Sequence, residues 1–232
     1  MSVRHKAYKE TLTKGYASEW NDDHITDFTD EITHDFNLIT TAITTEWDTA
    51  QTSGGSAPTI SMVSGHAFVV LNTGATTNNK SSMRAKLGGS ANNITNASDL
   101  PILTCSVNIA AVHTSGTVVE FGFQKYDDPI FTTNKSHALF RVKDNKLYAV
   151  CGDGTAETEV LIGNYNQYGH YRIEFTSTSV KFYVDNMVTA AATITTHIPT
   201  SDMTIKFSVV SQNNVNSTIR VDGCSLTILR KK

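Results

Sequence analysis

The sequence lacks an excess of charge of one sign, a long apolar run and an apolar leader. Its 19 Lys and Arg residues against 22 Asp and Glu residues leave a net charge of −3. We therefore expect no nucleic-acid partner, because that would require a basic field. No apolar run approaches the roughly 20 residues of a membrane-spanning helix, so we expect no membrane insertion. The opening residues, Met1–Lys14, lack the apolar centre of a signal peptide, which favours synthesis in a cytosol and another route to any place outside cells.

Cysteine is also scarce. The chain has three, Cys105, Cys151 and Cys224, far apart in the sequence and without a C-x-x-C spacing. An odd number without metal-ligand spacing predicts neither a disulfide framework nor a metal site. We expect three small buried side chains within strands.

What the chain has in quantity is Thr, Ser and Asn, a bias that favours strands and turns over helices. The clearest pattern is His170–Ala192, where Tyr171–Thr176 and Val180–Val184 alternate apolar and polar residues around the turn Ser177–Ser179. Alternation at period two predicts antiparallel strands with one face on a core. Further strands are predicted at Thr59–Val63, Ala67–Leu71, Ser81–Leu87, Ile102–Ala111, Thr117–Lys125, Ala138–Val142, Lys146–Cys151, Glu159–Ile162, Met203–Val210 and Ser217–Leu229. Many short strands without helices predict an all-β jelly-roll sandwich of two antiparallel sheets over residues 59–232.

The N-terminal part has a different pattern. After a polar arm over residues 1–20, apolar residues recur every three or four positions at Ile25, Phe28, Ile32, Phe36, Ile39, Ile43 and Trp47. This spacing predicts an α-helix over residues 21–50. We expect this helix to be a homo-oligomeric stalk, with a trimer preferred, or a docking helix, and its narrow apolar stripe favours self-association. Packing on its own domain is the alternative. The segment 51–58, QTSGGSAP, is a predicted linker.

Two resemblances follow from these segments. The pattern Y-R-I-E-F-T-x-T-x-V-K-F-Y-V-D-N at Tyr171–Asn186, the pair Ile198-Pro199 and the long last strand resemble the concanavalin A-like lectin and glucanase sandwiches, including laminin-G-like domains and family-sixteen glycanases. The likeness covers about residues 58–230 and implies the jelly-roll fold. The segment Leu12–Ile25, LTKGYASEWNDDHI, resembles the leading segments of phage and archaeal-virus fibre and appendage proteins.

The resemblance also implies a test for catalysis. A retaining glycanase needs two carboxylates about 5–5.5 Å apart, and family-sixteen enzymes carry them on one strand as E-x-D-x-x-E or E-x-D-x-E. The matching strand here, TVVEFGFQK, has Glu120 but no second carboxylate. The acidic pairs Asp127-Asp128 and Glu157…Glu159 read as solvated turn residues, and the histidines are scattered. We therefore expect no catalytic residues and no enzyme.

Candidate ligand-binding residues remain. Glu120 and Gln124 share the polar face of their strand, and Arg141 lies on the next one; the following loop adds Asn164, Tyr165, Gln167 and Tyr168. Aromatic rings and amides suit a sugar, although the same residues also suit rim packing and turns. No cofactor is expected, apart from a weak calcium candidate at Asp127 and Asp128.

These observations favour a non-enzymatic virion or appendage protein of the fibre or capsid-decoration type. Its arm would bind other virion proteins, and its lectin-like sandwich would contact host surface glycans from the virion or another extracellular surface. One alternative is a purely structural coat or filament module. The other is a polysaccharide-degrading glycanase, for which Glu120 would be essential.

Overall fold

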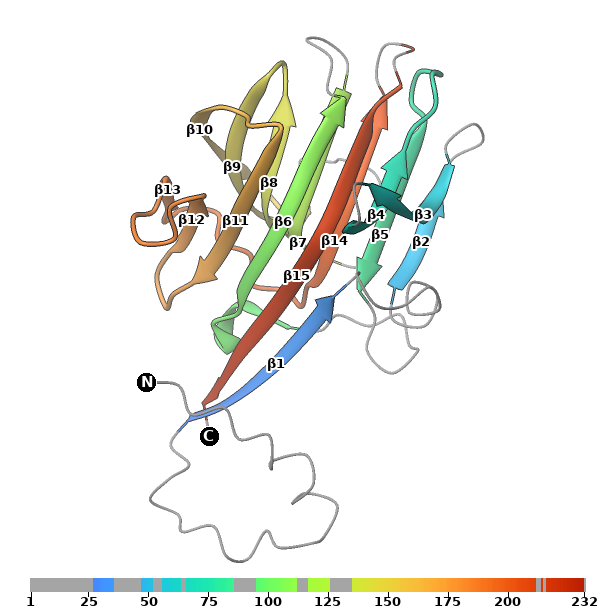
Figure 1. Cartoon of the computed structure of the whole chain (residues 1–232). Helices are drawn as coiled ribbons and strands as arrows, with labels where there is room; N and C mark the ends of the chain where they lie inside the picture. The colour runs from blue at the N-terminus through green and yellow to red at the C-terminus, as the bar shows by residue number, and fades with distance from the viewer. Residues whose placement is uncertain are drawn as a thin grey trace, which may run out of the picture.

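The computed structural model describes residues 27–35, 47–51, 56–63, 66–85, 95–111, 117–125, 135–211, 214 and 216–231. Most of them lie in two stacked antiparallel sheets, which Figure 1 shows nearly face to face. We name the eight-stranded one sheet A and the seven-stranded one sheet B. The prediction of an all-β sandwich is confirmed.

Sheet A contains the predicted meander and the long C-terminal strand. In spatial order its strands are β13 (Ala192–Ile194), β12 (Val180–Val184), β11 (Tyr168–Phe175), β6 (Ile102–Ala111), β15 (Thr218–Lys231), β4 (His66–Asn72) and β3 (Ser56–Val63), with β1 (Asp27–Asp35) paired to β15. The central pair is β15 with β6, where Cys224 lies opposite Cys105.

Sheet B contains the strand that matches the glycanase motif. Its order is β10 (Glu157–Asn164), β9 (Lys146–Asp153), β8 (Ser136–Lys143), β7 (Thr117–Gln124), β14 (Thr204–Ser211), β5 (Lys80–Ala85) and β2 (Trp47–Gln51). A short 3-10 turn, η3 (Ala97–Asp99), precedes β6 and is capped by Asn96. Among the described residues no helix has the length and hydropathy needed to cross a bilayer.

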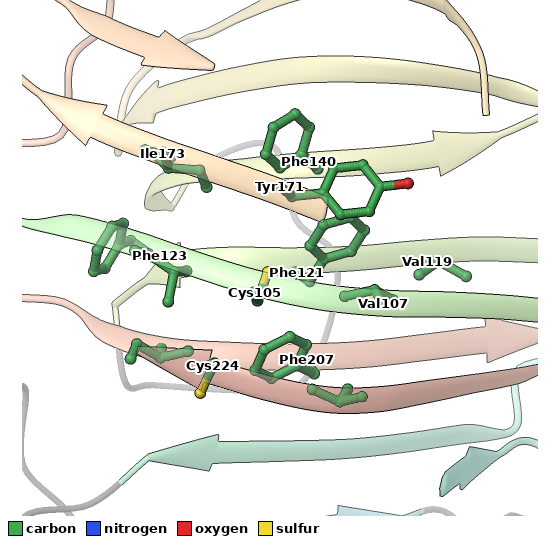
Figure 2. Packing of buried hydrophobic residues seen from close by; sticks show 14 of the residues in the cluster. Cys105, Val107, Val119, Phe121, Phe123, Phe140, Tyr171, Ile173, Phe207 and Cys224 are labelled. Carbon is green, nitrogen blue, oxygen red and sulfur yellow. The ribbon is translucent and has the colours of Figure 1, made fainter. Parts of the chain in front are cut away.

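The core lies between the sheets and is aromatic at its centre. Phe121 and Phe140 of sheet B stack at 5.4 Å between ring centroids, and Tyr171 of sheet A meets both edge-on at 4.8 and 5.0 Å. Figure 2 shows these rings clustered between the layers. Each buried aromatic side chain contributes about 1.5–3 kcal/mol by leaving water. The prediction that Tyr171, Ile173 and Phe175 face the core is confirmed, since all three are buried.

The three cysteines are free and buried, as the sequence predicts. Cys105 and Cys224 are neighbours on β6 and β15, labelled in Figure 2. Burial raises the pKa of all three thiols, so they stay protonated. They are packing residues of the core.

The predicted helix over residues 21–50 is wrong where the structure describes it. Asp27–Asp35 is strand β1, paired with β15 from Asp27 opposite Lys231 to Asp35 opposite Gly223. Trp47–Gln51 is strand β2, paired with β5. An apolar spacing of four places Phe28 and Ile32 on one face of a strand as well as of a helix. The threonines favour the strand, and β15 supplies a pairing partner that the sequence pattern does not reveal.

The predicted oligomerisation stripe is therefore not one helical face. Trp47 is buried in the sandwich and packs on Phe207 at 6.0 Å between ring centroids. Phe28 and Ile32 lie in β1, opposite Arg230 and Leu226. Ile25, Phe36, Ile39 and Ile43 lie outside the described residues, as does the predicted arm over residues 1–20.

The sheets also begin earlier than the predicted sandwich boundary at residue 59. Both β1 and β2 precede it, and β3 begins at Ser56, inside the predicted linker. Residues 52–55 of that linker lie outside the described part.

Candidate functional site

Strand register aligns four side chains across the outer face of sheet B. Glu120 of β7 lies opposite Arg141 of β8, Arg141 opposite Tyr148 of β9, and Tyr148 opposite Leu161 of β10. The alternate residues of β7, Val119, Phe121 and Phe123, belong to the core. Because successive side chains of a strand point to opposite faces, the aligned row points away from the core.

Arg141 joins three carboxylates on this face, and we call the group formed by Glu120, Arg141, Glu157 and Glu159 the Arg141 cluster. The Nε atom of Arg141 donates to Glu120 Oε1 at 2.6 Å. Its Nη1 donates to Glu157 Oε1 at 2.6 Å and to Glu159 Oε2 at 3.0 Å, while Nη2 donates to Glu157 Oε2 at 3.0 Å. The guanidinium thus makes a bidentate contact with Glu157, the strong geometry for this pair of groups.

His137 of β8 supports Glu157 of β10 across the intervening strand β9. Its Nε2 atom lies 3.0 Å from Glu157 Oε2, and the ring is buried. Gly152 makes room for this ring, because a Cβ there would lie 2.7 Å from His137 Cε1 and 2.7 Å from the carbonyl oxygen of Lys135. The missing side chain at residue 152 therefore lets the imidazole reach the glutamate.

The environment shifts the pKa values of the two best-held carboxylates in opposite directions. Burial raises the pKa of Glu120, which is 3% exposed, although Arg141 opposes this shift. Burial also acts on Glu157, but hydrogen bonds from His137 and Arg141 overcome it and lower the pKa to about 2. Burial would lower the pKa of Arg141, but Glu157 and Glu120 raise it above its usual value, so the guanidinium remains charged.

The middle of β7 departs from the glycanase motif at two positions. Gly122 stands where the motif E-x-D-x-E has its aspartate, and Gln124 stands where it has the second glutamate. A side chain at residue 122 is excluded, because its φ is +146° and a Cβ would lie 2.6 Å from Ala138 O and 2.7 Å from Leu139 Cα. Gln124 is buried opposite His137. An amide does not donate a proton as an acid does, so β7 does not carry the carboxylate pair of the motif.

The other two carboxylates of the Arg141 cluster lie on β10. Glu157 and Glu159 were predicted to be solvated turn residues, and this prediction is wrong. They lie in β10 and bind Arg141 of β8 across the intervening strand β9. Their separation by two residues was the signal, since i and i+2 share one face of a strand.

Next to the cluster lie side chains that suit the faces of sugar rings. Tyr148 is half-buried, and Leu161 is 55% exposed, one of few large apolar side chains so open to solvent. Lys143 Nζ lies 4.8 Å from the Tyr148 ring centroid and 2.7 Å from Glu159 Oε1. The row therefore runs from a buried acid on β7 to an apolar edge on β10.

The predicted loop residues lie elsewhere, where the chain passes from sheet B to sheet A. Asn164 ends β10 and accepts a hydrogen bond from Lys146 Nζ at 2.7 Å. Tyr165 is partly buried against the core, and the Gln167 carbonyl accepts from Ile109 N at 2.7 Å. Tyr168 begins β11 and donates to Asp222 Oδ2 at 3.2 Å. Asn164, Tyr165, Gln167 and Tyr168 thus form a separate region from the Arg141 cluster.

The weak calcium candidates Asp127 and Asp128 lie outside the described residues. Within the described ranges, no three His, Cys, Asp or Glu side chains gather as ligands for a metal ion.

No protein-family model and no curated protein matches the chain. Solved structures match it over most of its length. A native glycosidic hydrolase aligns with TM-score 0.61 and 12% identity, over 87% of this chain and 96% of that one. The Bacillus licheniformis beta-glucanase aligns with TM-score 0.57 and 17% identity, over 89% and 98%. The metal-free carbohydrate recognition domain of Emp46p aligns with TM-score 0.58 and 11% identity, over 83% and 94%.

At these identities the likeness establishes a concanavalin A-like sandwich, as the first resemblance implies. It also corrects the functional prediction. Structures that match include glycoside hydrolases, among them glucanases and a lichenase, and carbohydrate recognition domains. These matches contradict the prediction of a non-enzymatic virion protein, which is wrong. No match supports the resemblance of Leu12–Ile25 to viral fibre proteins, and that segment lies outside the described residues.

Proposed function

We propose that the chain is a polysaccharide-degrading glycoside hydrolase that acts from the outer face of sheet B. One observation carries the proposal. Glu120 and Glu157 flank the same guanidinium, and their surroundings shift the two pKa values apart, upward for Glu120 and down to about 2 for Glu157. Two carboxyl groups with separated pKa values are what glycosidic bond cleavage requires.

The roles follow from the shifts. Glu120, with its raised pKa, acts as the general acid and gives its proton to the oxygen of the departing sugar as the C–O bond breaks. Glu157 remains ionised and stabilises the positive charge that develops at the anomeric carbon. A water molecule from solvent then adds to that carbon and gives its proton back to Glu120. Two carboxylates on adjacent edges of one guanidinium lie several ångströms apart, the order of the roughly 5–9.5 Å found in glycosidases.

Arg141 and His137 position these groups. The guanidinium fixes both carboxylates by charged hydrogen bonds, and the imidazole beside Glu157 Oε2 holds the second oxygen. Because the cluster is largely buried, these interactions are stronger than they would be in water.

The substrate path follows from the row of side chains. A sugar chain that crosses β7, β8, β9 and β10 would place one ring at Glu120 and later rings over Tyr148 and Leu161. Aromatic and aliphatic side chains bind the C–H face of a pyranose by burying it from water. Because several solved structures with this fold are named as β-glucanases or lichenases, we propose a β-linked glucan as the substrate.

Release of reducing ends from mixed-linkage β-glucan tests the proposal. Wild-type protein is expected to release them, and Glu120→Gln or Glu157→Gln to lower kcat at least about 100-fold, since each loses a carboxylate of the reaction. The matched control is Glu174→Gln on sheet A, which also removes a carboxylate paired with an arginine and should leave kcat unchanged. Absence of release by the wild type between pH 4 and 8 would overturn the proposal, as would full activity of Glu120→Gln.

Two further proposals accompany this function. A large polysaccharide cannot enter a cell, so we place the site of action outside it. The homo-oligomer predicted from residues 21–50 stays a prediction, which sedimentation of the full chain tests.

A further inference from the structure

A second group of sugar-compatible side chains lies on the outer face of sheet A, away from the Arg141 cluster. We call Tyr168, His170, Ser106, Asn108 and Asp222 the Tyr168 patch. Strand register brings them together, because Tyr168 lies opposite Asn108 and His170 opposite Ser106 on β11 and β6. An irregularity in β15 between Val221 and Gly223 adds Asp222 beside them.

The patch faces solvent. Tyr168 is 42% exposed, and few other large hydrophobic side chains of the described residues are as open to solvent. His170 is exposed as well. The core-facing neighbours on β11 are Tyr171 and Ile173, both buried. The two exposed rings lie at 90° with centroids 5.3 Å apart and form a corner.

Hydrogen bonds hold the corner in place. Tyr168 OH donates to Asp222 Oδ2 at 3.2 Å, and His170 Nδ1 lies 2.8 Å from Ser106 Oγ. Asp185 accepts from the His170 backbone N–H at 2.9 Å and from Asn166 Nδ2 at 3.1 Å, which fixes the preceding loop. Burial and Asp222 raise the pKa of Tyr168, so its phenol stays a donor. A surface fixed in this way loses little entropy when it binds.

Polar atoms without a protein partner gather on the same face. Asn108 Oδ1 and Asp222 Oδ1 make no hydrogen bond within the described structure, and neither does Arg172 Nε on the next row of β11. Covered polar atoms are normally hydrogen-bonded. This face therefore needs hydroxyl groups or water to complete its hydrogen bonds.

We propose that the Tyr168 patch binds a segment of a neutral polysaccharide chain and is a second glycan-binding surface, separate from the Glu120 face. The two exposed rings suit the C–H faces of pyranoses. The amide of Asn108 and the carboxylate of Asp222 suit vicinal hydroxyls. Asp222 adds one negative charge to this face, and Arg220, opposite Asn108 on β15, adds one positive charge, so a neutral glycan suits the patch better than a polyanion does.

This inference goes beyond the proposed hydrolase and does not depend on it. If both are correct, the two sheets bind the same polymer at two places. Attachment through sheet A would then raise the local concentration of chain segments at sheet B.

Affinity electrophoresis of the full chain through gels with soluble mixed-linkage β-glucan tests the proposal. The experiment uses Glu120→Gln protein, so that the polymer in the gel stays intact. Tyr168→Ala in this background should raise the apparent Kd about five- to tenfold, the size expected for loss of a stacking ring. Tyr168→Phe keeps the ring and should retain most of the affinity. Because Tyr168 is exposed, both variants should fold, which thermal unfolding checks.

Val188→Ala, which shortens an exposed apolar side chain outside both proposed glycan surfaces, is the control and should leave the retardation unchanged. Retardation unchanged by Tyr168→Ala would overturn the inference, and so would no retardation of the parent protein. Equal loss in Tyr168→Ala and Tyr168→Phe would assign the effect to the Asp222 hydrogen bond and would overturn the stacking role. If Tyr168→Ala loses retardation while wild-type protein releases no reducing ends, the hydrolase proposal fails and this one stands.

Discussion

The outer faces of the two sheets each carry an arginine paired with glutamate, but the two arginines are held differently. Arg141 on sheet B has a side chain only 11% exposed and binds three carboxylates. Arg172 on sheet A is 25% exposed, binds Glu174 at 2.7 Å and covers the Tyr183 ring at 3.9 Å. The Arg141 network lies on the outer face of sheet B but is almost closed to solvent. The Arg172–Glu174 pair is an ordinary surface ion pair.

The two arginines also differ in where their partners come from along the chain. Arg172 pairs with a residue two positions away on its own strand. Arg141 collects its partners from β7 and β10, which lie on either side of it in the sheet but far apart in the chain. A network assembled from three strands can be buried, because each partner satisfies a charge that would be costly alone.

The largest expected effect comes from removing the central cation. Arg141→Met leaves buried carboxylates without a counter-ion and should lower the free energy of unfolding by about 3–5 kcal/mol. Arg172→Met should lower it by about 1 kcal/mol or less, since its pair is solvent-screened. Urea denaturation measures both; equal losses would contradict the distinction between the two faces.

Alanine in place of a glycine should destabilise sheet B more than sheet A. Gly122→Ala should lower the free energy of unfolding by about 3 kcal/mol or more, because a Cβ there would meet the backbone of β8 at a φ of +146°. At Gly169 on sheet A a Cβ would meet the phenol end of Tyr171, 2.7 Å away, which has more freedom to shift. Gly169→Ala should therefore cost less. A larger loss for Gly169→Ala in the same denaturation series would reverse this ranking.

The loss of folding free energy at acid pH should also differ between the two sheets, by less than the substitutions above. The pKa of Glu157 is lowered to about 2 in the folded protein, so its contribution is present above its unfolded pKa and is lost as pH falls from about 5 toward 2. After allowance for solvent screening, this contribution is about 1 kcal/mol. Glu157→Gln should flatten the acid limb of stability against pH, measured by urea denaturation from pH 6 to 2.

The pKa of Glu120 is shifted in the opposite direction from that of Glu157. Its raised pKa means that folding favours its protonated form, so stability is lost as pH rises through the unfolded pKa toward the folded one. Glu120→Gln should remove that loss. Glu174→Gln on sheet A serves as the control, and an acid limb flattened as much by this control as by Glu157→Gln would contradict the assignment.

The smallest stability effect is expected at the apolar end of the row. Leu161→Ser changes an exposed side chain and should alter the free energy of unfolding by less than about 0.5 kcal/mol. If the protein is the proposed hydrolase, Leu161→Ser should raise KM for the glucan severalfold with little change in kcat, because Leu161 lies away from Glu120. An unchanged KM would remove Leu161 from the substrate path.

Much of the fold was predictable from residue patterns. The strands of residues 59–231 follow from alternation at period two, and the burial of Tyr171, Ile173 and Phe175 follows from the same rule. The N-terminal segment was mispredicted, because a spacing of four fits one face of a strand as well as of a helix. Only pairing with β15 and β5 distinguishes the two, and pairing is a long-range property.

The candidate site was half predictable. Glu120, Gln124 and Arg141 could be placed on one polar face from the alternation of β7 and β8. Glu157 and His137 were not assigned, because their part in the site depends on β10 and β8 lying on either side of β9 in sheet B.

Local residue patterns are enough to identify a two-sheet β-sandwich, since apolar alternation, turn residues and the scarcity of helix formers act locally along the chain. They also show that no catalytic pair lies on β7 alone. It takes the folded structure to show that Glu157 and Glu159 bind the same guanidinium as Glu120, and that Tyr168 lies beside Asn108 and binds Asp222. Those contacts depend on strand order and register, which long-range burial of the two core faces establishes and no local pattern encodes.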